Sequence, residues 1–216
     1  MSKKLLPTHT IITASLALTL LMSTAPIATA QVASGTGATA VGSGSNASGF
    51  NSVALGNAAV ASGNDSTAVG QSADAIRTDA TAIGADAQAT GNQSTSLGDS
   101  ARASNTDTTA VGQSADATQA NSTAVGADAQ ATGPTSTALG DDARATGGDA
   151  TAVGQSADAT GSNSIALGAD AQATGSSSTA VGQSAAATRT DATAVGQSAD
   201  ATQTSSTAVG LSLIHI

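Results

Sequence analysis

The residues that could do chemistry in this sequence are almost all aspartates. The chain of 216 residues contains fifteen acidic residues, six Lys and Arg, two His and no Cys. Every acidic residue is an Asp, and the segment 31–210 contains no His, Cys, Lys, Glu or Tyr. An ordinary general base or an activated nucleophile other than a carboxylate is therefore missing, and neither a disulfide nor a cysteine-ligated metal site can form. We predict that the protein is not an enzyme, with no catalytic residue and no cofactor.

A pair of carboxylates could still act as acid and base, and Asp141 and Asp142 are adjacent. Consecutive strand residues point to opposite faces, however, and Asp142 has equivalents at Asp86, Asp128 and Asp170, which favours a repeated solvent-facing decoration. Calcium needs about six to eight converging oxygens, whereas these carboxylates are spread along the chain. The sequence therefore predicts no metal site.

The first thirty residues have the pattern of a secretory signal peptide. Lys3 and Lys4 precede an apolar stretch at 11–22, and Ala28-Thr29-Ala30 forms a small-x-small cleavage site. A membrane anchor is the alternative, but a span requires about 20 apolar residues. The rest of the chain carries four Arg against fifteen Asp, a balance of −11. Such a surface repels phosphate, so nucleic acid and anionic lipid are poor partners.

One period of fourteen residues organises the segment 31–210. A large apolar residue recurs at this spacing thirteen times and forms the apolar column Val41, Leu55, Val69, Ile83, Leu97, Val111, Val125, Leu139, Val153, Leu167, Val181, Val195 and Val209. Each is followed by glycine, which gives the glycine column Gly42, Gly56, Gly70, Gly84, Gly98, Gly112, Gly126, Gly140, Gly154, Gly168, Gly182, Gly196 and Gly210. The residue before each is alanine, with Ser96 as the exception. This regularity predicts a solenoid that stacks one coil per repeat.

The composition within each repeat predicts two short strands and two turns. Thr67-Ala68-Val69 and Ala73-Asp74-Ala75 both alternate with period two, so we expect Thr67 and Val69 on one face, and Ala73 and Ala75 on another. Turn-forming residues separate the strands; they include Gly63, Gly91, Gly133 and Gly147, and Asp65, Asp79, Asn121, Asp149 and Asn163. We expect the apolar column to form the core, facing alanine across a thin interior.

A polar column supports in-register stacking independently. Five residues after each apolar residue the chain reads Asp74, Gln88, Arg102, Asp116, Gln130, Arg144, Asp158, Gln172, Ala186 and Asp200. Stacked coils would lie about 4.8 Å apart and set Arg102 beside Asp116 and Arg144 beside Asp158. The order also reveals a super-period of three coils, which either tandem duplication or selection for charge pairing explains.

The thin core predicts an obligate oligomer. Residues 31–210 contain only nineteen Val, Ile, Leu and Phe, so one coil buries little apolar surface against the ordering cost of about 1–2 kcal/mol per residue. Packing of several chains against an outer face of small residues, such as Ala68 and Gly70, would supply further stabilisation.

These features resemble the head repeats of trimeric autotransporter adhesins, the YadA-like left-handed parallel β-roll. The repeats at 51–63 and 163–175 are the closest to the family pattern of Asn-Ser-Val-Ala-Ile-Gly followed by spaced Ser, Ala and Gly, and the resemblance covers 36–210. It implies three identical chains in a rod-like head on the surface of a Gram-negative bacterium, with a coiled-coil stalk and an outer-membrane barrel beyond it. It also implies attachment to extracellular matrix proteins, host cells, abiotic surfaces or one another, and so a role in virulence.

Two departures and two alternatives accompany this resemblance. Thr replaces the family's Val in most copies, as at Thr67, Thr81 and Thr95, and residues 211–216 break the repeat after Gly210. We expect 211–216 to be a non-native or truncated tail of an N-terminal fragment, with a capping peptide as the alternative.

The threonine column also allows an ice-binding solenoid, although we expect Val69 inside and an ice-binding face usually pairs two outward threonines per coil. A purely structural surface spacer is the other alternative.

Overall fold

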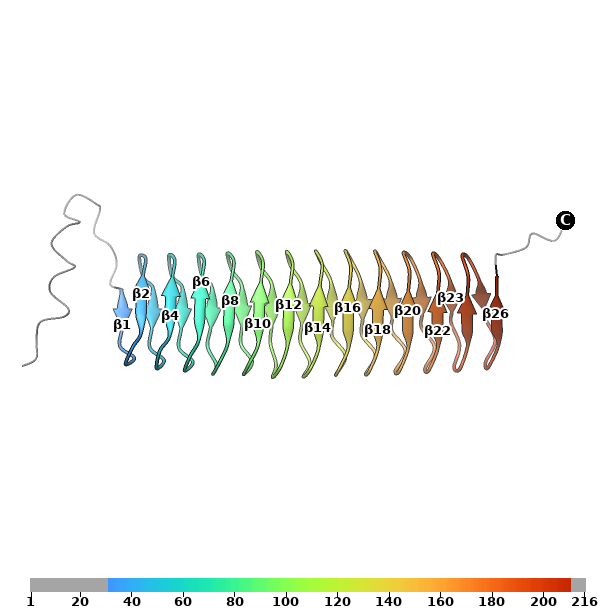
Figure 1. The fold of residues 1–216 in the computed structure, drawn as a ribbon, viewed down its shortest axis with the longest axis horizontal. Coiled ribbons are helices and arrows are strands. Elements are labelled where there is room, and N and C mark those ends of the chain that lie inside the picture. The colour runs from blue at the N-terminus through green and yellow to red at the C-terminus, as the bar shows by residue number, and fades with distance from the viewer. Residues whose placement is uncertain (1–30, 211–216) are drawn as a thin grey trace, which may run out of the picture.

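The computed structural model describes residues 31–210, and they form one straight stack of coils (Figure 1). Each coil of fourteen residues contains two short strands separated by turns, as predicted. The described residues contain no helix, and therefore none long and apolar enough to cross a membrane. The predicted signal peptide, 1–30, and the predicted non-native tail, 211–216, lie outside the described residues.

The strands form two parallel sheets of thirteen strands each, which we call sheet 1 and sheet 2. Sheet 1 contains the two-residue strands β1 (Val32–Ala33), β3 (Asn46–Ala47), β5 (Val60–Ala61), β7 (Asp74–Ala75), β9 (Gln88–Ala89), β11 (Arg102–Ala103), β13 (Asp116–Ala117), β15 (Gln130–Ala131), β17 (Arg144–Ala145), β19 (Asp158–Ala159), β21 (Gln172–Ala173), β23 (Ala186–Ala187) and β25 (Asp200–Ala201). Sheet 2 contains the three-residue strands β2 (Thr39–Val41), β4 (Val53–Leu55), β6 (Thr67–Val69), β8 (Thr81–Ile83), β10 (Thr95–Leu97), β12 (Thr109–Val111), β14 (Thr123–Val125), β16 (Thr137–Leu139), β18 (Thr151–Val153), β20 (Ile165–Leu167), β22 (Thr179–Val181), β24 (Thr193–Val195) and β26 (Thr207–Val209).

The register places each residue over its equivalent fourteen positions later. Thr67 pairs with Thr81 and Val69 with Ile83 in sheet 2, while Arg102 pairs with Asp116 in sheet 1. Backbone hydrogen bonds join successive coils throughout the strands and continue into the turns. The prediction of a parallel β-solenoid with stacked fourteen-residue coils is therefore confirmed.

The interior contains alanine and small hydroxyl residues in place of the apolar column. In one coil Ala68, Ala73, Ala75 and Ala80 are fully buried, and their equivalents are buried as well except at the two ends of the rod. Members of the apolar column lie outside, where Leu97 is 43% exposed. The prediction that the apolar column forms the core of the chain is therefore wrong.

The narrow gap between the two sheets explains this inversion. Strand alternation allows either Ala68 or its neighbours Thr67 and Val69 to point inward. With only short turns joining the sheets, methyl groups fill the interior, so the larger side chains point outward. The expected outer face of small residues at Ala68 and Gly70 is corrected for the same reason, because that face carries Thr and Val.

The glycine column is required by backbone geometry. Gly126 has a φ of 139°, and a Cβ atom there would lie 2.1 Å from the carbonyl oxygen of Gly140 in the next coil. Neither the dihedral angle nor the space admits a side chain. The strict glycine spacing therefore follows from the close stacking of coils.

The predicted turn residues adopt the left-handed conformation. Asp65, Asp79, Asn121, Asp149 and Asn163 all have φ between 54° and 59°. Asp and Asn tolerate this region better than most residues. A second left-handed position, beyond the turn residues predicted from the sequence, lies in the other turn and is occupied by Ser72, Asp86 and their equivalents.

Ser96 gives a test of the alanine interior. Its hydroxyl is buried without a hydrogen-bond partner, and its partners above and below are Ala82 and Ala110. We expect Ser96→Ala to raise the free energy of unfolding by about 1 kcal/mol, because it removes an unpaired buried polar group. Chemical denaturation followed by circular dichroism measures this change.

The matched control is Ser94→Ala in the same coil. Ser94 is also buried, but its hydroxyl donates a 2.7 Å hydrogen bond to the carbonyl oxygen of Gly91. This substitution is expected to lower stability by about 1 kcal/mol. Equal effects of the two substitutions would contradict the described interior.

Candidate functional site: the outward faces of the rod

The rod presents two flat faces and two edges to its surroundings. Each face is the outer side of one sheet, and each edge is formed by one set of turns (Figure 1). Because the interior is filled by small side chains, ligands can be recognised only on these surfaces. We therefore describe the residues that each surface displays.

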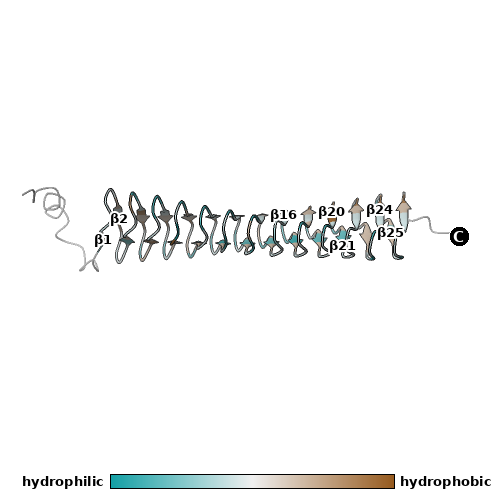
Figure 2. Ribbon diagram, turned by 90° about the horizontal axis from the view of Figure 1, so that it is seen from below, coloured by the Kyte–Doolittle hydropathy of each residue, from teal (hydrophilic) through white to brown (hydrophobic). Residues whose placement is uncertain are grey.

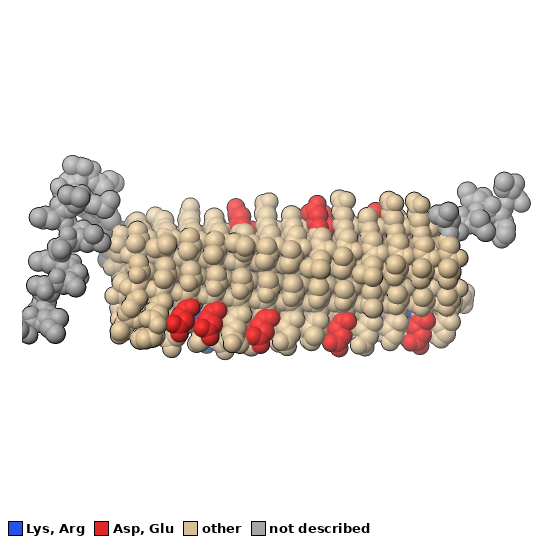
Figure 3. Space-filling view, in the orientation of Figure 1, with Lys and Arg blue, Asp and Glu red and all other residues tan. Residues whose placement is uncertain are grey.

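The face of sheet 2 displays threonine beside large apolar residues. In β12 and β14, Thr109 and Thr123 lie outward, as do Val111 and Val125, while the alanine between them is buried. Figure 3 looks onto this face and shows no charged side chain on it, with Asp confined to the upper and lower edges. The face is thus a continuous uncharged band, in which the apolar column between its ends is exposed by 36% to 43% at six coils and half-buried at the others.

The sequence carries a signal for this arrangement in the size of the residues that each column accepts. The apolar column contains Val, Ile and Leu interchangeably, whereas the position of Ala68 is alanine in all but one repeat. A site that accepts three shapes is loosely enclosed, and a site that accepts only the smallest side chains is tightly enclosed. Variation of size within each column therefore indicates which side is the interior.

The face of sheet 1 is polar and carries the predicted column of Asp, Gln and Arg. In Figure 2 the strand row containing β21 is largely teal, opposite the paler and browner row containing β16 and β20. Arg102 forms a bidentate ion pair with Asp116, with Nε and the terminal nitrogen 3.0 and 2.9 Å from the carboxylate oxygens. Arg144 lies over Asp158 in the predicted register, but within 31–210 the Arg102–Asp116 pair is the one ion pair formed.

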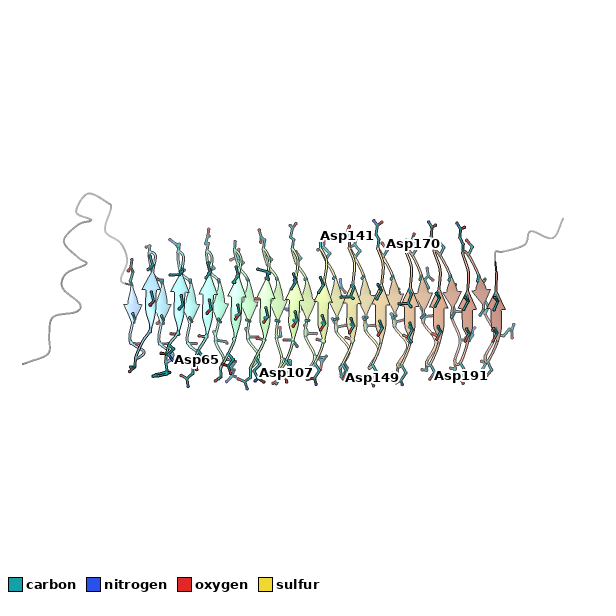
Figure 4. All side chains as sticks on the ribbon, viewed as in Figure 1. Asp65, Asp107, Asp141, Asp149, Asp170 and Asp191 are labelled. Carbon is teal, nitrogen blue, oxygen red and sulfur yellow. The ribbon has the colours of Figure 1, made fainter. Side chains whose placement is uncertain are left out.

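The two edges carry most of the remaining aspartates. Asp65, Asp107, Asp149 and Asp191 follow one edge, whereas Asp141 and Asp170 lie on the opposite edge (Figure 4). Asp141 and Asp142 lie in a turn, with Asp142 at φ 56°, so the prediction that they are consecutive strand residues is wrong. Both are exposed.

Neither a metal cage nor a deep pocket is present in the part of the chain that the structure describes. Among residues 31–210, no three potential ligands from His, Cys, Asp and Glu gather closely enough to hold a metal ion. One shallow, open hollow lies at an edge near Asn64, Ile76, Arg77 and Asn92. The faces are therefore the candidate functional surfaces.

Two charged residues on sheet 1 have shifted pKa values. Burial raises the pKa of Asp74 because partial desolvation disfavours its charged form. The hydrogen bond to Asp116 and the charge of Asp116 raise the pKa of Arg102. The charge of Asp74 thus opposes folding, whereas the charged guanidinium of Arg102 is stabilised by Asp116.

Asp74→Asn is expected to stabilise the protein at pH 7 by a few tenths of a kcal/mol, because the group is largely exposed to solvent screening. The folded-state pKa lies above the unfolded one, so the wild type gains stability relative to the variant as pH falls through the folded-state pKa. Melting temperatures at pH 7 and pH 3 measure this difference. Asp170→Asn, at an exposed edge position, is the control, and an equal gain there would contradict the assignment.

A family model described as the YadA head domain repeat (2 copies) matches residues 33–49, 47–73, 78–101, 103–129, 131–157, 159–185 and 187–212. A search of curated proteins found no match. The longer matches each span about two coils of the solenoid, and their family forms the surface-exposed part of adhesins of the trimeric autotransporter type. The chain therefore belongs to the YadA head-repeat family.

Proposed function

We propose that this chain is the head of a bacterial surface adhesin, in which three copies pack side by side and the assembled rod attaches to host matrix, host cells or surfaces. The observation that carries the proposal is the outward apolar column on sheet 2. Single soluble chains rarely expose a continuous apolar band along their whole length. A face of this kind is suited to burial against identical copies.

The alternation of inward and outward side chains along the strands of sheet 2 supports this packing. Val and Leu of the apolar column lie in straight rows, so three parallel chains in register would bring equivalent rows together around one axis. Their burial would contribute about 25 cal/mol for each Å² of apolar surface removed from water. This contribution would compensate for an interior that contains only alanine and small hydroxyl side chains.

The same arrangement supports attachment by many weak contacts. Thirteen coils at about 4.8 Å form a rod of about 60 Å that repeats similar surfaces along its length. Three chains would multiply the number of contacts again, so weak individual contacts would add as avidity. A signal peptide at 1–30 and location on the outer membrane complete this proposal. They accord with a surface protein exported across the inner membrane.

The oligomeric state tests the packing. We expect the purified chain to have the mass of three copies, and the double substitution Leu97→Asp and Leu139→Asp to give single chains. Both residues lie on the apolar column, and a charge there would be buried unpaired in the assembly. Light scattering measures the mass, with Gln113→Asp and Gln155→Asp at an exposed edge as the control. A monomeric wild type would contradict the proposal.

Attachment is tested in the same experiment series. Bacteria carrying the complete gene are compared with bacteria lacking residues 31–210 for adhesion to immobilised matrix protein, host cells and plastic. Loss of adhesion on deletion supports the adhesin, whereas unchanged adhesion would favour a structural spacer.

Ice binding is a second candidate, because the structure removes one of the two arguments against it, the expected inward direction of Val69. Most coils still pair the outward threonine with a Val, Ile or Leu and not with a second threonine. Thr109 and Val111 both lie outward, so sheet 2 offers a flat array of hydroxyl and methyl groups at regular spacing. If ice binds there, the purified chain shows thermal hysteresis that Thr109→Lys abolishes and Thr118→Lys, at the residue that follows β13 of sheet 1, preserves. Absence of hysteresis in the wild type would exclude this candidate.

A further inference from the structure

The outward column of sheet 1 contains a repeating triplet of one acid, one amide and one base. We call its central part the charge ladder, and it consists of Asp74, Gln88, Arg102, Asp116, Gln130, Arg144, Asp158 and Gln172. Each member lies directly over the next in the parallel register. The ladder thus presents a fixed sequence of charges along a straight line.

Pairing within one chain leaves part of this ladder unsatisfied. Arg102 and Asp116 form the bidentate pair described above. Arg144 forms no ion pair within residues 31–210, and one carboxylate oxygen of Asp158, Oδ1, is buried without a hydrogen-bond partner. The Arg144 guanidinium is therefore available to a carboxylate of a partner, whereas Asp158 can receive a donor from outside only at Oδ2, because its Oδ1 is enclosed by this chain.

The order of the triplet is complementary to itself when it is read in the opposite direction. Asp-Gln-Arg set against its own reversal places every Asp opposite an Arg and every Gln opposite a Gln. Two parallel ladders in register would instead place like charges opposite each other. Parallel ladders shifted by one or two coils would match opposite charges at only one coil in three.

One antiparallel alignment also provides a carboxylate for Arg144. With Gln130 opposite Gln130 at the centre, Arg102 of each copy faces Asp158 of the other, and Arg144 faces Asp116. Gln88 then faces Gln172, so seven coils on each chain are matched. Four ion pairs and three pairs of amides form along about 29 Å of rod.

Side-chain length supports the same alignment. The Arg102 side chain is 50% exposed and protrudes, whereas the Asp116 side chain is 24% exposed and recessed. Gln88, Gln130 and Gln172 are exposed and intermediate in length. In the antiparallel alignment a long side chain meets a short one and two intermediate ones meet each other, so the gap between the rods is even.

We propose that the charge ladder is a contact surface for a second copy of this chain lying antiparallel to the first. This inference rests on the proposed surface head and names one of its partners. If sheet 2 packs inside the assembly, sheet 1 remains on its outside. Two heads that project from opposing surfaces meet antiparallel, so the ladder joins heads of different cells and not heads of the same cell.

Charge reversal tests the proposal. The acidic variant carries Arg102→Asp and Arg144→Asp, and the basic variant carries Asp74→Arg, Asp116→Arg and Asp158→Arg. Beads coated with either variant alone are expected to clump at least about tenfold less than wild-type beads, whereas a mixture of the two regains clumping. Clumping of the wild type is also expected to fall between about 0.05 and 0.5 M salt. Unchanged clumping of the single variants, or no recovery in the mixture, would overturn the proposal.

Edge aspartates provide the matched control. Asp79→Arg, Asp107→Arg and Asp149→Arg make the same charge change as the basic variant but lie in exposed turns. This control is expected to clump with itself as the wild type does. Circular dichroism of each variant establishes that the coils remain folded.

Crosslinking tests the direction of the contact, because the chain lacks cysteine and a single Cys can be introduced cleanly. Oxidation of a mixture of Gln88→Cys and Gln172→Cys proteins is expected to give the mixed disulfide, and Gln130→Cys to crosslink with itself. Self-crosslinking at Gln88→Cys and at Gln172→Cys without the mixed product indicates parallel rods and would overturn the proposal.

Attachment to a foreign surface separates this inference from the proposed function. The same coated beads are applied to plates carrying matrix protein or bare plastic. Attachment of all variants, with clumping that does not depend on the ladder, would refute only the ladder contact. Wild-type beads that clump through the ladder but do not attach to either plate would support the ladder and argue against attachment to foreign surfaces.

Discussion

The narrow space between the two sheets is the constraint on which this structure depends. Fourteen residues make a coil so flat that only methyl and small hydroxyl groups fit inside, as Ala68, Ala73 and Ala75 show. The glycine column follows from the same closeness, since a Cβ at Gly126 would strike the backbone of the next coil. The protein therefore holds its shape mainly through hydrogen bonds between coils, and its large apolar groups are available for contacts outside the chain.

Because of this constraint, the two faces and the turns carry different residues and have different roles. Sheet 2 carries threonine and the apolar column without charge, which suits contact with identical copies. Sheet 1 carries the charged and amide groups, and the turns carry aspartates in left-handed positions such as Asp65 and Asp79. The two faces differ because the outward residues of each sheet can vary while the inward residues of the same strands remain alanine.

The period, the register and the turns could be predicted from the sequence, because each depends on residues that recur at one spacing. Gly70 and Asp79 reveal their roles through backbone preferences that do not depend on the surroundings. The direction of Val69 could not be predicted from its hydrophobicity, since both faces of a short strand satisfy the same alternation and only the width of the interior decides between them. The ion pair between Arg102 and Asp116 could be predicted from the stacking of coils. The equivalent pair between Arg144 and Asp158 does not form, because its formation depends on side-chain conformations that a repeated sequence does not specify.

The three-coil super-period has a mechanical consequence for two rods joined through the charge ladder. A slide of three coils along the axis, about 14 Å, restores the same opposition of acid and base over a shorter overlap. A force directed along the rods therefore meets a series of equivalent resting positions, and the junction yields in steps under shear flow before it separates.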